Sequence, residues 1–279
     1  MSSTAAPIEE RFPRPAIVGV LNVTPDSFSD GGEFMRVGDA IAQGKRLSEE
    51  GAALVDVGGE STRPGARAVS PAEELARVEP VLAGLAGITI SIDTSKAVVA
   101  RHALELGAVL VNDVTALRGD PDLAGVVAGA GAYLCLMHMR GEPRTMQTAP
   151  RYDDVVSEVA AFLEARLAFA VTQGIPEEKV CLDPGIGFGK SPDHNLELVR
   201  RLDRIVAIGR PVLVGFSRKS TLGKVLGDSS ATQGTLPASL GAAVAAFERG
   251  AWFLRVHDVR ATVEALAVAA AVGRGKVTA

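Results

Sequence analysis

The sequence predicts a single α/β barrel, in which eight parallel strands alternate with eight helices. Short runs of β-branched and apolar residues recur eight times along the 279 residues, and each run ends in polar residues. Segments with helical patterning separate the runs, as expected for the crossovers between parallel strands. The polar residues should therefore gather at the carboxyl ends of the strands, where barrels of this type carry their chemistry.

Polar residues close each of the apolar runs. In order, the runs and their polar ends are 17–21 with Asn22, 54–55 with Asp56, 88–92 with Asp93, 109–111 with Asn112 and Asp113, 133–137 with His138, 180–182 with Asp183, 212–216 with 217–219, and the run from Trp252 with Arg255 and His257. We expect Asp93, Asn112 and Asp183 to lie together at the rim of the barrel, although each would also serve as a helix cap. Two carboxylates and an amide suit the edge of a flat ring rich in N–H groups, such as a pterin or a purine.

The segments between the runs have helical patterning. Ser70, Pro71 and Glu73 predict the clearest helix start, a capping box in which two free amide donors are satisfied. Two connections, 24–36 and 58–70, are longer than usual turns and are candidate functional loops. The other predicted helices span 37–50, 96–106, 121–130, 155–172, 195–206, 236–248 and 259–272.

Composition and charge limit the classes of function. Hydrophobic residues make up 47% of the chain, which is enough for a large core, and the length fits one α/β domain. The formal net charge of −4 argues against nucleic-acid and anionic-membrane partners. No apolar run is long enough to cross a membrane, and there is no secretory signal, so we expect a cytoplasmic protein.

Two parts of the chain are expected to have no role in the site. The first 15 residues contain three prolines and no apolar core, and they predict a flexible tail ahead of a barrel domain over 16–279. Cys135 and Cys181 fall inside predicted strands. They are expected to serve packing rather than a disulfide scaffold.

The two long loops carry groups that suit a charged ligand. The first presents Asp26 and Asp30, which can face a cation, and Phe28, which can cover it, although these residues also suit an ordinary polar turn. The second places two hydroxyls beside Arg63. Hydroxyls with a guanidinium suit a phosphate or a carboxylate.

Three further motifs follow later strands. The glycine-rich stretch 183–190 is neither a Walker loop nor a dinucleotide fingerprint, but it allows close approach of a ligand, with Phe188 as a wall. The stretch 215–220 brings hydroxyls and two cations to a strand-to-helix turn, which suits an anion or a polar ring. Arg255 and His257 share one face of the last strand and can serve one ligand.

The metal chemistry predicted from the sequence is limited. There is neither an H-E-x-x-H nor a C-x-x-C motif, so zinc hydrolysis is not expected. A Mg²⁺ ion carried by a phosphorylated substrate needs only one or two protein oxygens, which Asn22 or Asp26 can supply.

Taken together, these motifs resemble those of the dihydropteroate synthases, a family of pterin-binding barrels of the TIM type. The matching stretches occur in the family's order and cover nearly the whole chain. They are 18–32, 56–65, 91–94, 111–113, 136–141, 183–190, 215–220 and 255–258.

The resemblance implies a transferase of folate biosynthesis. Such an enzyme condenses 6-hydroxymethyl-7,8-dihydropterin pyrophosphate with 4-aminobenzoate and releases 7,8-dihydropteroate and pyrophosphate. The resemblance also implies Mg²⁺, inhibition by sulfonamides, which mimic 4-aminobenzoate, and a homodimer formed by the late helices 236–248 and 259–272. Those two helices would equally suit the ordinary outer ring of a barrel.

The resemblance also assigns residues to the three parts of the substrates. The pterin region matches Asp93, Asn112, Met137, Asp183, Gly187, Phe188, Gly215, Lys219 and Arg255. The pyrophosphate region matches Asn22, Thr62, Arg255 and His257, with Asn22 as the expected Mg²⁺ ligand and Asp26 as a second candidate. The aminobenzoate region matches Phe28, Arg63, Pro64, Phe188, Lys219 and Ser220, and catalytic roles fall on Asp30, Arg63, Asp93, Asp183, Lys219 and Arg255.

The charges in this set suggest a dissociative, SN1-like reaction, in which carboxylates favour positive charge on the pterin ring while cations stabilise the leaving pyrophosphate. Two alternatives remain open from the sequence. A pterin-binding methyltransferase that works with a corrinoid protein would share the barrel but would not need Arg63, Pro64 and the stretch 217–220. A non-catalytic pterin-binding paralogue would have little use for two long catalytic loops.

Overall fold

Eight parallel strands form the centre of the computed structural model, which describes residues 6–24, 33–62, 66–141, 145–147 and 149–274. Each strand is short, and most of their residues are buried. The strands are β1 (Ala16–Asn22), β2 (Leu54–Gly58), β3 (Ile90–Asp93), β4 (Leu110–Asp113), β5 (Tyr133–Met137), β6 (Val180–Asp183), β7 (Leu213–Val214) and β8 (Phe253–Val256).

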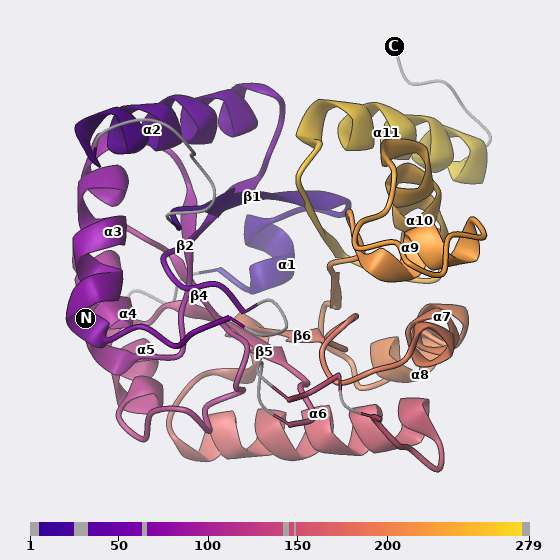
Figure 1. Ribbon diagram of the computed structural model, residues 1–279. Coiled ribbons are helices and arrows are strands. Elements are labelled where there is room, and N and C mark those ends of the chain that lie inside the picture. The colour runs from indigo at the N-terminus through magenta and orange to yellow at the C-terminus, as the bar shows by residue number, and fades with distance from the viewer. Residues whose placement is uncertain (1–5, 25–32, 63–65, 142–144, 148, 275–279) are drawn as a thin grey trace.

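The sheet closes into a barrel. Its strand order is β6-β5-β4-β3-β2-β1-β8-β7, so strands that follow one another in the chain are neighbours, and β8 returns to lie beside β1. A parallel bridge between Leu182 and Val212 joins β6 to the segment that leads into β7. Figure 1 shows the strands in the middle and the helices in a ring around them, which confirms the predicted α/β barrel.

The outer helices follow the strands as the sequence predicts, with three differences. The predicted helix 195–206 is two helices, because the chain turns at Arg201 and buries both Leu202 and Ile205. Two short elements, α9 (Ser220–Val225) and the 3₁₀ turn η2 (Glu177–Lys179), lack enough residues to show a periodic pattern. The helices are α2 (Glu33–Glu49), α3 (Pro71–Gly84), α4 (Ala97–Glu105), α5 (Leu123–Ala130), α6 (Val155–Thr172), η2 (Glu177–Lys179), α7 (Pro192–Arg200), α8 (Asp203–Val206), α9 (Ser220–Val225), α10 (Leu236–Glu248) and α11 (Val259–Arg274).

Only one of the two hydrogen bonds of the predicted capping box is present at the start of α3. The Ser70 hydroxyl accepts a hydrogen bond from the Glu73 amide at 3.2 Å, as an N-cap should. The Glu73 carboxylate, however, accepts from Arg77 one turn further on, at 2.6 Å. A reciprocal capping box occurs instead at α7, between Ser191 and His194.

Two hydrophobic layers stabilise the barrel. The larger layer lies between the strands and the outer helices and contains residues from β1 to α11. The smaller layer fills the inside of the barrel, and it includes Val18, Leu110 and Phe253. Cys135 and Cys181 belong to this inner layer as fully buried, free thiols on paired positions of β5 and β6, so their packing role is confirmed.

The segment before β1 differs from the predicted flexible tail. Residues 8–11 form a short helix, α1 (Ile8–Arg11), which lies across the middle of the ring in Figure 1. Ile8 and Phe12 are buried in the inner layer, and the Phe12 ring meets Tyr133 and Phe253 edge to face, at centroid distances of 5.7 and 6.0 Å. The sequence signal is the spacing of four between two apolar residues, which is too short to stand out.

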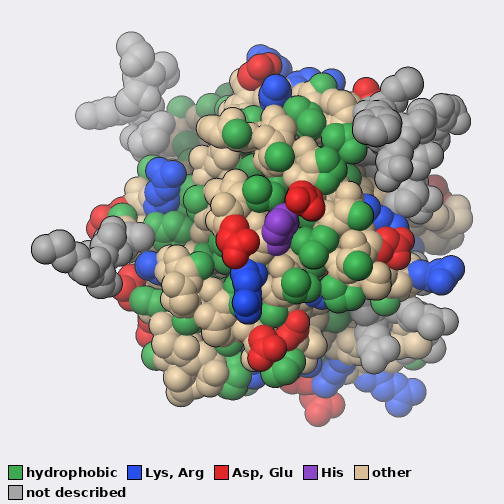
Figure 2. Space-filling view, turned by 90° about the vertical axis from the view of Figure 1, so that its left-hand side faces the viewer, with side chains coloured by type: hydrophobic (Ala, Val, Ile, Leu, Met, Phe, Trp, Pro, Cys, Tyr) green, Lys and Arg blue, Asp and Glu red, His purple; other side chains and the backbone are tan. Residues whose placement is uncertain are grey.

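The outer surface has a mixed character on the side covered by α2 to α5. Figure 2 shows acidic and basic side chains interspersed there with apolar and uncharged ones. Such a mixture is usual for solvated outer helices. Within the part of the chain that is described, no helix combines the length and the apolar character that a membrane span requires.

Replacing Phe12 by alanine should destabilise the protein, because it opens a cavity inside the barrel and removes two aromatic contacts. We expect the free energy of unfolding to fall by about 3 to 5 kcal/mol in a denaturant titration. Glu10→Ala, an exposed position on the same short helix, is the matched control and should change it by less than about 0.5 kcal/mol. Equal behaviour of the two variants would mean that the segment does not plug the barrel in solution.

Candidate active site

A buried carboxylate lies at the centre of the polar residues inside the rim. Asp56 is 1% exposed and accepts from Ser91 Oγ at 2.7 Å, from Asn112 Nδ2 at 3.0 Å and from Arg255 Nε at 2.7 Å. The sequence placed Asp56 at a strand end, which is wrong, since β2 continues for two more residues. Asp56 therefore lies deeper in the barrel than Asp93, whose register partner in β2 is Gly58.

Arg255 joins two carboxylates from neighbouring strands. Its second contact runs from a terminal nitrogen to Asp93 Oδ2 at 2.9 Å. The two carboxylates raise the pKa of Arg255, against the burial that lowers it. Burial raises the pKa of Asp93 to about 7, while Arg255 opposes that shift. Opposite charges in a buried site hold each other in place, because either one alone would be costly.

Asn112 leaves one acceptor free. Its amide nitrogen is bonded to Asp56, whereas its buried Oδ1 has no hydrogen-bond partner in the part of the chain that is described. Buried polar atoms are nearly always satisfied, so an unsatisfied oxygen beside Asp93 is suited to a ligand N–H. The adjacent Asp113 has a different role, since it accepts from the amides of Thr115 and Leu117 and shapes the following turn.

Asp183 ends β6 as predicted and is buried. Its Oδ1 accepts from the Gly185 amide at 2.7 Å. Burial raises the pKa of Asp183 to about 6, while that hydrogen bond and the cations Lys219 and Lys190 oppose the shift. A carboxylate with this environment can accept hydrogen bonds from a ring edge at neutral pH.

A buried lysine organises the glycine-rich loop after β6. Lys190 Nζ contacts His138 Nδ1 at 2.9 Å and the carbonyl oxygens of Gly185 and Phe188 at 2.9 and 3.0 Å. Burial lowers the pKa of His138 to about 2 and that of Lys190 to about 7, so the His138 ring is neutral. Nδ1 of His138 accepts from Lys190 whenever the lysine is charged, because an ammonium only donates. His138 is therefore structural. A side chain at Gly185 would clash with the carbonyl oxygen of His138 at 1.9 Å, which explains the glycine there.

An apolar wall and a cation lie beside these carboxylates. Phe188 packs against a cluster of four buried residues, Val114, Met137, Met139 and Met146. Lys219 Nζ lies 4.5 Å from the centre of the Phe188 ring, and Gly187 leaves room for the Lys219 side chain. A flat ligand can stack on such a wall while its edge meets the polar residues.

His257 and Ser217 form a second polar group at the ends of β7 and β8. Ser217 Oγ accepts from the His257 amide at 3.2 Å and lies 3.1 Å from His257 Nδ1. Burial lowers the pKa of His257 to about 4, with Arg255 contributing, so the ring is neutral at pH 7. Because the hydroxyl hydrogen is free to donate to Nδ1, this arrangement favours an Nε2–H donor for an anion. Arg218 is engaged elsewhere, in two hydrogen bonds to Asp258.

The remaining predicted site residues lie at the rim or outside the described residues. Asn22, at the end of β1, is half-buried, as are Thr62, Gly215 and Ser220. Asp26, Phe28, Asp30, Arg63 and Pro64 fall on residues that the structure does not describe. The structure thus links three of the predicted residues: Arg255 contacts Asp93 directly, and Asp56 joins Arg255 to Asn112. It also gathers Met137, Gly187, Phe188 and Lys219 around the loop that follows Asp183.

The site fits a metal ion only if a ligand brings it. The described residues contain no group of three or more His, Cys, Asp or Glu side chains that would hold a metal ion by themselves. Asn22 offers a neutral oxygen next to the loop that carries Thr62, since Asn22 pairs with Gly58 in the sheet. One such oxygen suits a Mg²⁺ ion whose other ligands are phosphate oxygens and water.

Sequence reasoning missed two residues with clear roles. The sequence pattern predicts Asp56 as the polar end of a strand without a role in the site, and it predicts no role for Lys190 within the stretch 183–190. The same signal was available for both residues. Each is a charged residue within a stretch of apolar residues or glycines, and a charged side chain that is buried in such a stretch seldom lacks a partner.

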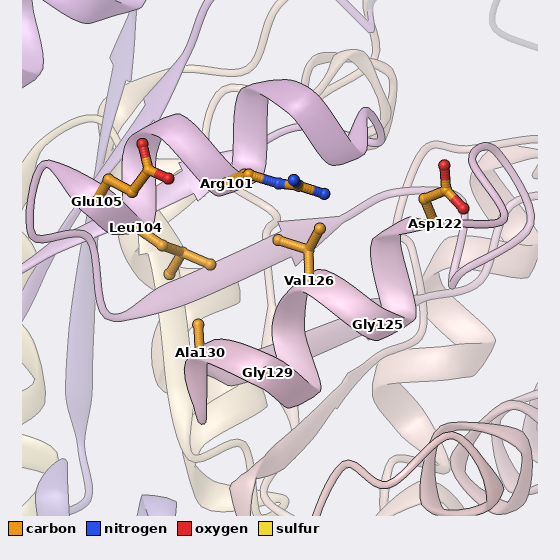
Figure 3. Close-up of a pocket in the computed structure, with 8 residues that line it drawn as sticks. All are labelled: Arg101, Leu104, Glu105, Asp122, Gly125, Val126, Gly129 and Ala130. Carbon is orange, nitrogen blue, oxygen red and sulfur yellow. The ribbon is translucent and has the colours of Figure 1, made fainter.

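A surface groove lies between α4 and α5, outside the ring. Figure 3 shows that the residues lining it, among them Arg101, Glu105, Asp122 and Val126, come from these two helices and their ends. None of the residues discussed above lines it. The chemistry of the strand ends, and not this groove, therefore defines the candidate site.

Comparisons with known proteins agree with the geometry. A family model described as pterin binding enzyme matches residues 18–257. Dihydropteroate synthase from Neisseria meningitidis serogroup B is 48% identical over 267 residues, which cover 93% of each chain. The Xanthomonas albilineans dihydropteroate synthase solved with 4-aminobenzoic acid matches with a TM-score of 0.85 at 47% identity over 94% of each chain. The Yersinia pestis enzyme in a sulfonamide complex matches with a TM-score of 0.87 at 43% identity, over 94% of this chain and 95% of the other.

The raised pKa of Asp183 predicts a pH dependence of stability. Between pH 3.8, the usual value, and about 6, the folded protein holds a proton that the unfolded chain releases. The contribution of Asp183 to the free energy of unfolding should therefore fall as the pH rises through this window, by at most about 1.4 kcal/mol per pH unit. In Asp183→Asn this contribution should be absent.

Urea unfolding of both proteins at several pH values from 4 to about 6 measures the difference in slope. Glu177→Gln, which removes an exposed carboxyl before β6, controls for the loss of one acidic group. Parallel profiles for the parent protein and Asp183→Asn would contradict the prediction.

Proposed function

This chain belongs to the pterin-binding enzymes and, among them, to the dihydropteroate synthases, and from that premise we propose how its residues divide the work of the reaction. The enzyme is a transferase that joins 6-hydroxymethyl-7,8-dihydropterin pyrophosphate to 4-aminobenzoate. The observation that supports this division of roles most strongly is the buried Oδ1 of Asn112, which has no partner among the described residues, while Asp56 holds the amide nitrogen and Asp93 is the neighbour in the sheet. Neither the methyltransferase nor the non-catalytic paralogue is favoured by relatives of this name and identity.

The pterin ring binds with its polar edge toward the strand ends. Asp93, Asn112 and Asp183 accept hydrogen bonds from its N–H and amino groups. The ring stacks against Phe188 and the apolar cluster that includes Met137, and Lys219 Nζ lies over the Phe188 ring. This division follows from donor and acceptor chemistry: the pocket offers acceptors where a pterin offers donors.

The aminobenzoate binds beside the pterin at the outer part of the site. Lys219 and Ser220, at the beginning of α9, together with Phe188, supply a cation, a hydroxyl and an aromatic face. A guanidinium from Arg63 would pair with the substrate carboxylate, with Phe28 and Pro64 as further contacts; these three residues lie outside the described residues.

The pyrophosphate leaves toward the ends of β1 and β8. Arg255 and the neutral His257 supply a guanidinium and an N–H donor there, and Thr62 supplies a hydroxyl. Asn22 would hold a Mg²⁺ ion that arrives with the pyrophosphate, and Asp26 is a second candidate ligand. When bound, the ion neutralises phosphate charge.

The reaction proceeds by departure of pyrophosphate before attack. The C–O bond to pyrophosphate breaks, and positive charge spreads from the methylene carbon into the pterin ring, where the carboxylates of Asp93 and Asp183 stabilise it. Asp30 on the first long loop is a further carboxylate for this cation. The aniline nitrogen then forms the C–N bond and releases one proton. A neutral aniline needs no general base before attack.

We also propose that two copies of the chain associate through the last helices. On α11, Val268 and Val272 are 65% and 75% exposed and lie one turn apart, so they share a face. Leu236 at the start of α10 is exposed too. Exposed apolar side chains in neighbouring helices are suited to a symmetric contact.

The test of the proposed function is pyrophosphate release by the purified protein with the pterin pyrophosphate and Mg²⁺, with and without 4-aminobenzoate. We expect dihydropteroate in the complete mixture, competitive inhibition by a sulfonamide, and slow release without 4-aminobenzoate. Asp183→Ala should show no pterin binding by calorimetry, since the ring loses a charged acceptor. Pterin binding without any release in the parent protein would contradict the assignment as a synthase.

Lys219 should contribute its charge to catalysis as well as its packing. In Lys219→Met the aliphatic stem is kept, and we expect kcat/KM to fall by about 10-fold to 100-fold, as for the loss of a charged hydrogen bond. Arg218→Met is the matched control: it removes the neighbouring cation, which is occupied by Asp258. It should change kcat/KM by less than about threefold. Equal losses would assign the effect to net charge.

A further inference from the structure

We propose that Asp56 is a positioning residue for the substrate ring: it holds the side-chain amide of Asn112 in the one orientation that presents the carbonyl oxygen to the ligand. Asp56 itself lies one layer deeper in the barrel, because its register partner in β3 is Ser91, whereas Asn112 pairs with Asp93 at the strand ends. The inference rests on the proposed function and assigns a role to a residue that does not touch the substrate.

The orientation of an amide is decided by the partner that faces it. Asn112 places one amide atom 3.0 Å from Asp56 Oδ2, and Arg255 Nε lies 2.7 Å from the same oxygen. A guanidinium can only donate, so Oδ2 accepts from it and carries no proton. The atom that Asn112 presents to Oδ2 must then be the donor, its NH₂ group.

The consequence is a defined acceptor at the ligand. With Nδ2 committed to Asp56, Oδ1 points the other way, and it is buried without a partner among the described residues. If the amide turned over, two acceptors would face each other across 3.0 Å and the site would present a donor instead. Asp56 therefore decides that Asn112 offers the ligand an acceptor and not a donor. The site consequently binds a ring N–H group in preference to a ring atom that accepts.

The burial of Asp56 makes the orientation rigid. The residue is 1% exposed, and its other oxygen accepts from Ser91 Oγ at 2.7 Å. Three donors from β3, β4 and β8 thus fix both oxygens, which leaves the carboxylate little freedom to follow a turned amide. Positioning of this kind is effective because the supporting contacts are themselves packed.

The experiment compares binding of the dihydropterin pyrophosphate to the full-length protein and to Asp56→Asn by calorimetry. In Asp56→Asn the new amide can donate as well as accept, so the Asn112 amide is free to turn over. We expect the dissociation constant to rise by about 10-fold to 100-fold, the range for the loss of a charge-assisted hydrogen bond. An unchanged dissociation constant would overturn the inference.

Ser91→Ala is the matched control. It removes a donor to the same buried carboxylate, at the same depth, but leaves both contacts to Oδ2 in place. It should lower the melting temperature while keeping the dissociation constant within about threefold. If Ser91→Ala weakens binding as much as Asp56→Asn does, the effect is one of general stability and the inference fails.

A double variant separates orientation from folding. In an Asn112→Ala background there is no amide for Asp56 to orient, so adding Asp56→Asn should raise the dissociation constant by less than about threefold beyond Asn112→Ala alone. Asn112→Ala keeps the ion pair of Asp56 with Arg255, and by itself it should raise the dissociation constant by about 10-fold to 100-fold. An unchanged dissociation constant in Asn112→Ala would overturn the inference even if Asp56→Asn alone unfolds.

If Asp56→Asn weakens binding as much in the Asn112→Ala background as it does in the parent protein, Asp56 acts without the Asn112 amide, and the role of amide orientation is overturned. Failure of the unsubstituted protein to bind the pterin at all would be a different result, since it would overturn the proposed function and the inference together.

Discussion

The ion pair between Asp56 and Arg255 is the interaction on which the rest of the site depends. The two residues come from β2 and β8, which flank β1, and they are 199 positions apart in the chain. Neither charge is tolerable alone in such a place, because a buried ion without a partner costs several kcal/mol. The pair can exist only when the barrel has closed, so the fold and the polar site form together. Asn112 and Asp93 then take their positions from this pair.

The rule that chemistry lies at the carboxyl ends of parallel strands was enough to find the outer part of the site. Asp93, Asn112 and Asp183 each end an apolar run, and a parallel barrel leaves them no other place than a common rim. The same rule does not identify Asp56 or Lys190 as residues of the site. Their roles depend on which way a side chain points and on partners such as Arg255 and His138, and neither is visible in a local pattern.

The errors in the predicted fold have a common physical origin. A helix of four residues before β1 has no room for a period, and its two apolar side chains matter only because the inside of the barrel is open to receive them. The helix predicted over 195–206 divides for a similar reason: burial of Leu202 and Ile205 in the assembled structure outweighs the continuous local preference. Long helices such as α6, whose pattern is repeated over 18 residues, were predicted to the residue.

The two paired cysteines offer a chemical probe for global unfolding of the barrel. Cys135 and Cys181 are the chain's two cysteines, and both lie fully buried on facing positions of β5 and β6. The contact between the thiols and burial raise the pKa of Cys135 well above its usual value, and neither sulfur is accessible to an external reagent. Fraying of the outer helices would leave both thiols protected. Their rate of alkylation under native conditions should therefore follow the rare global unfolding events of the molecule rather than its local fluctuations.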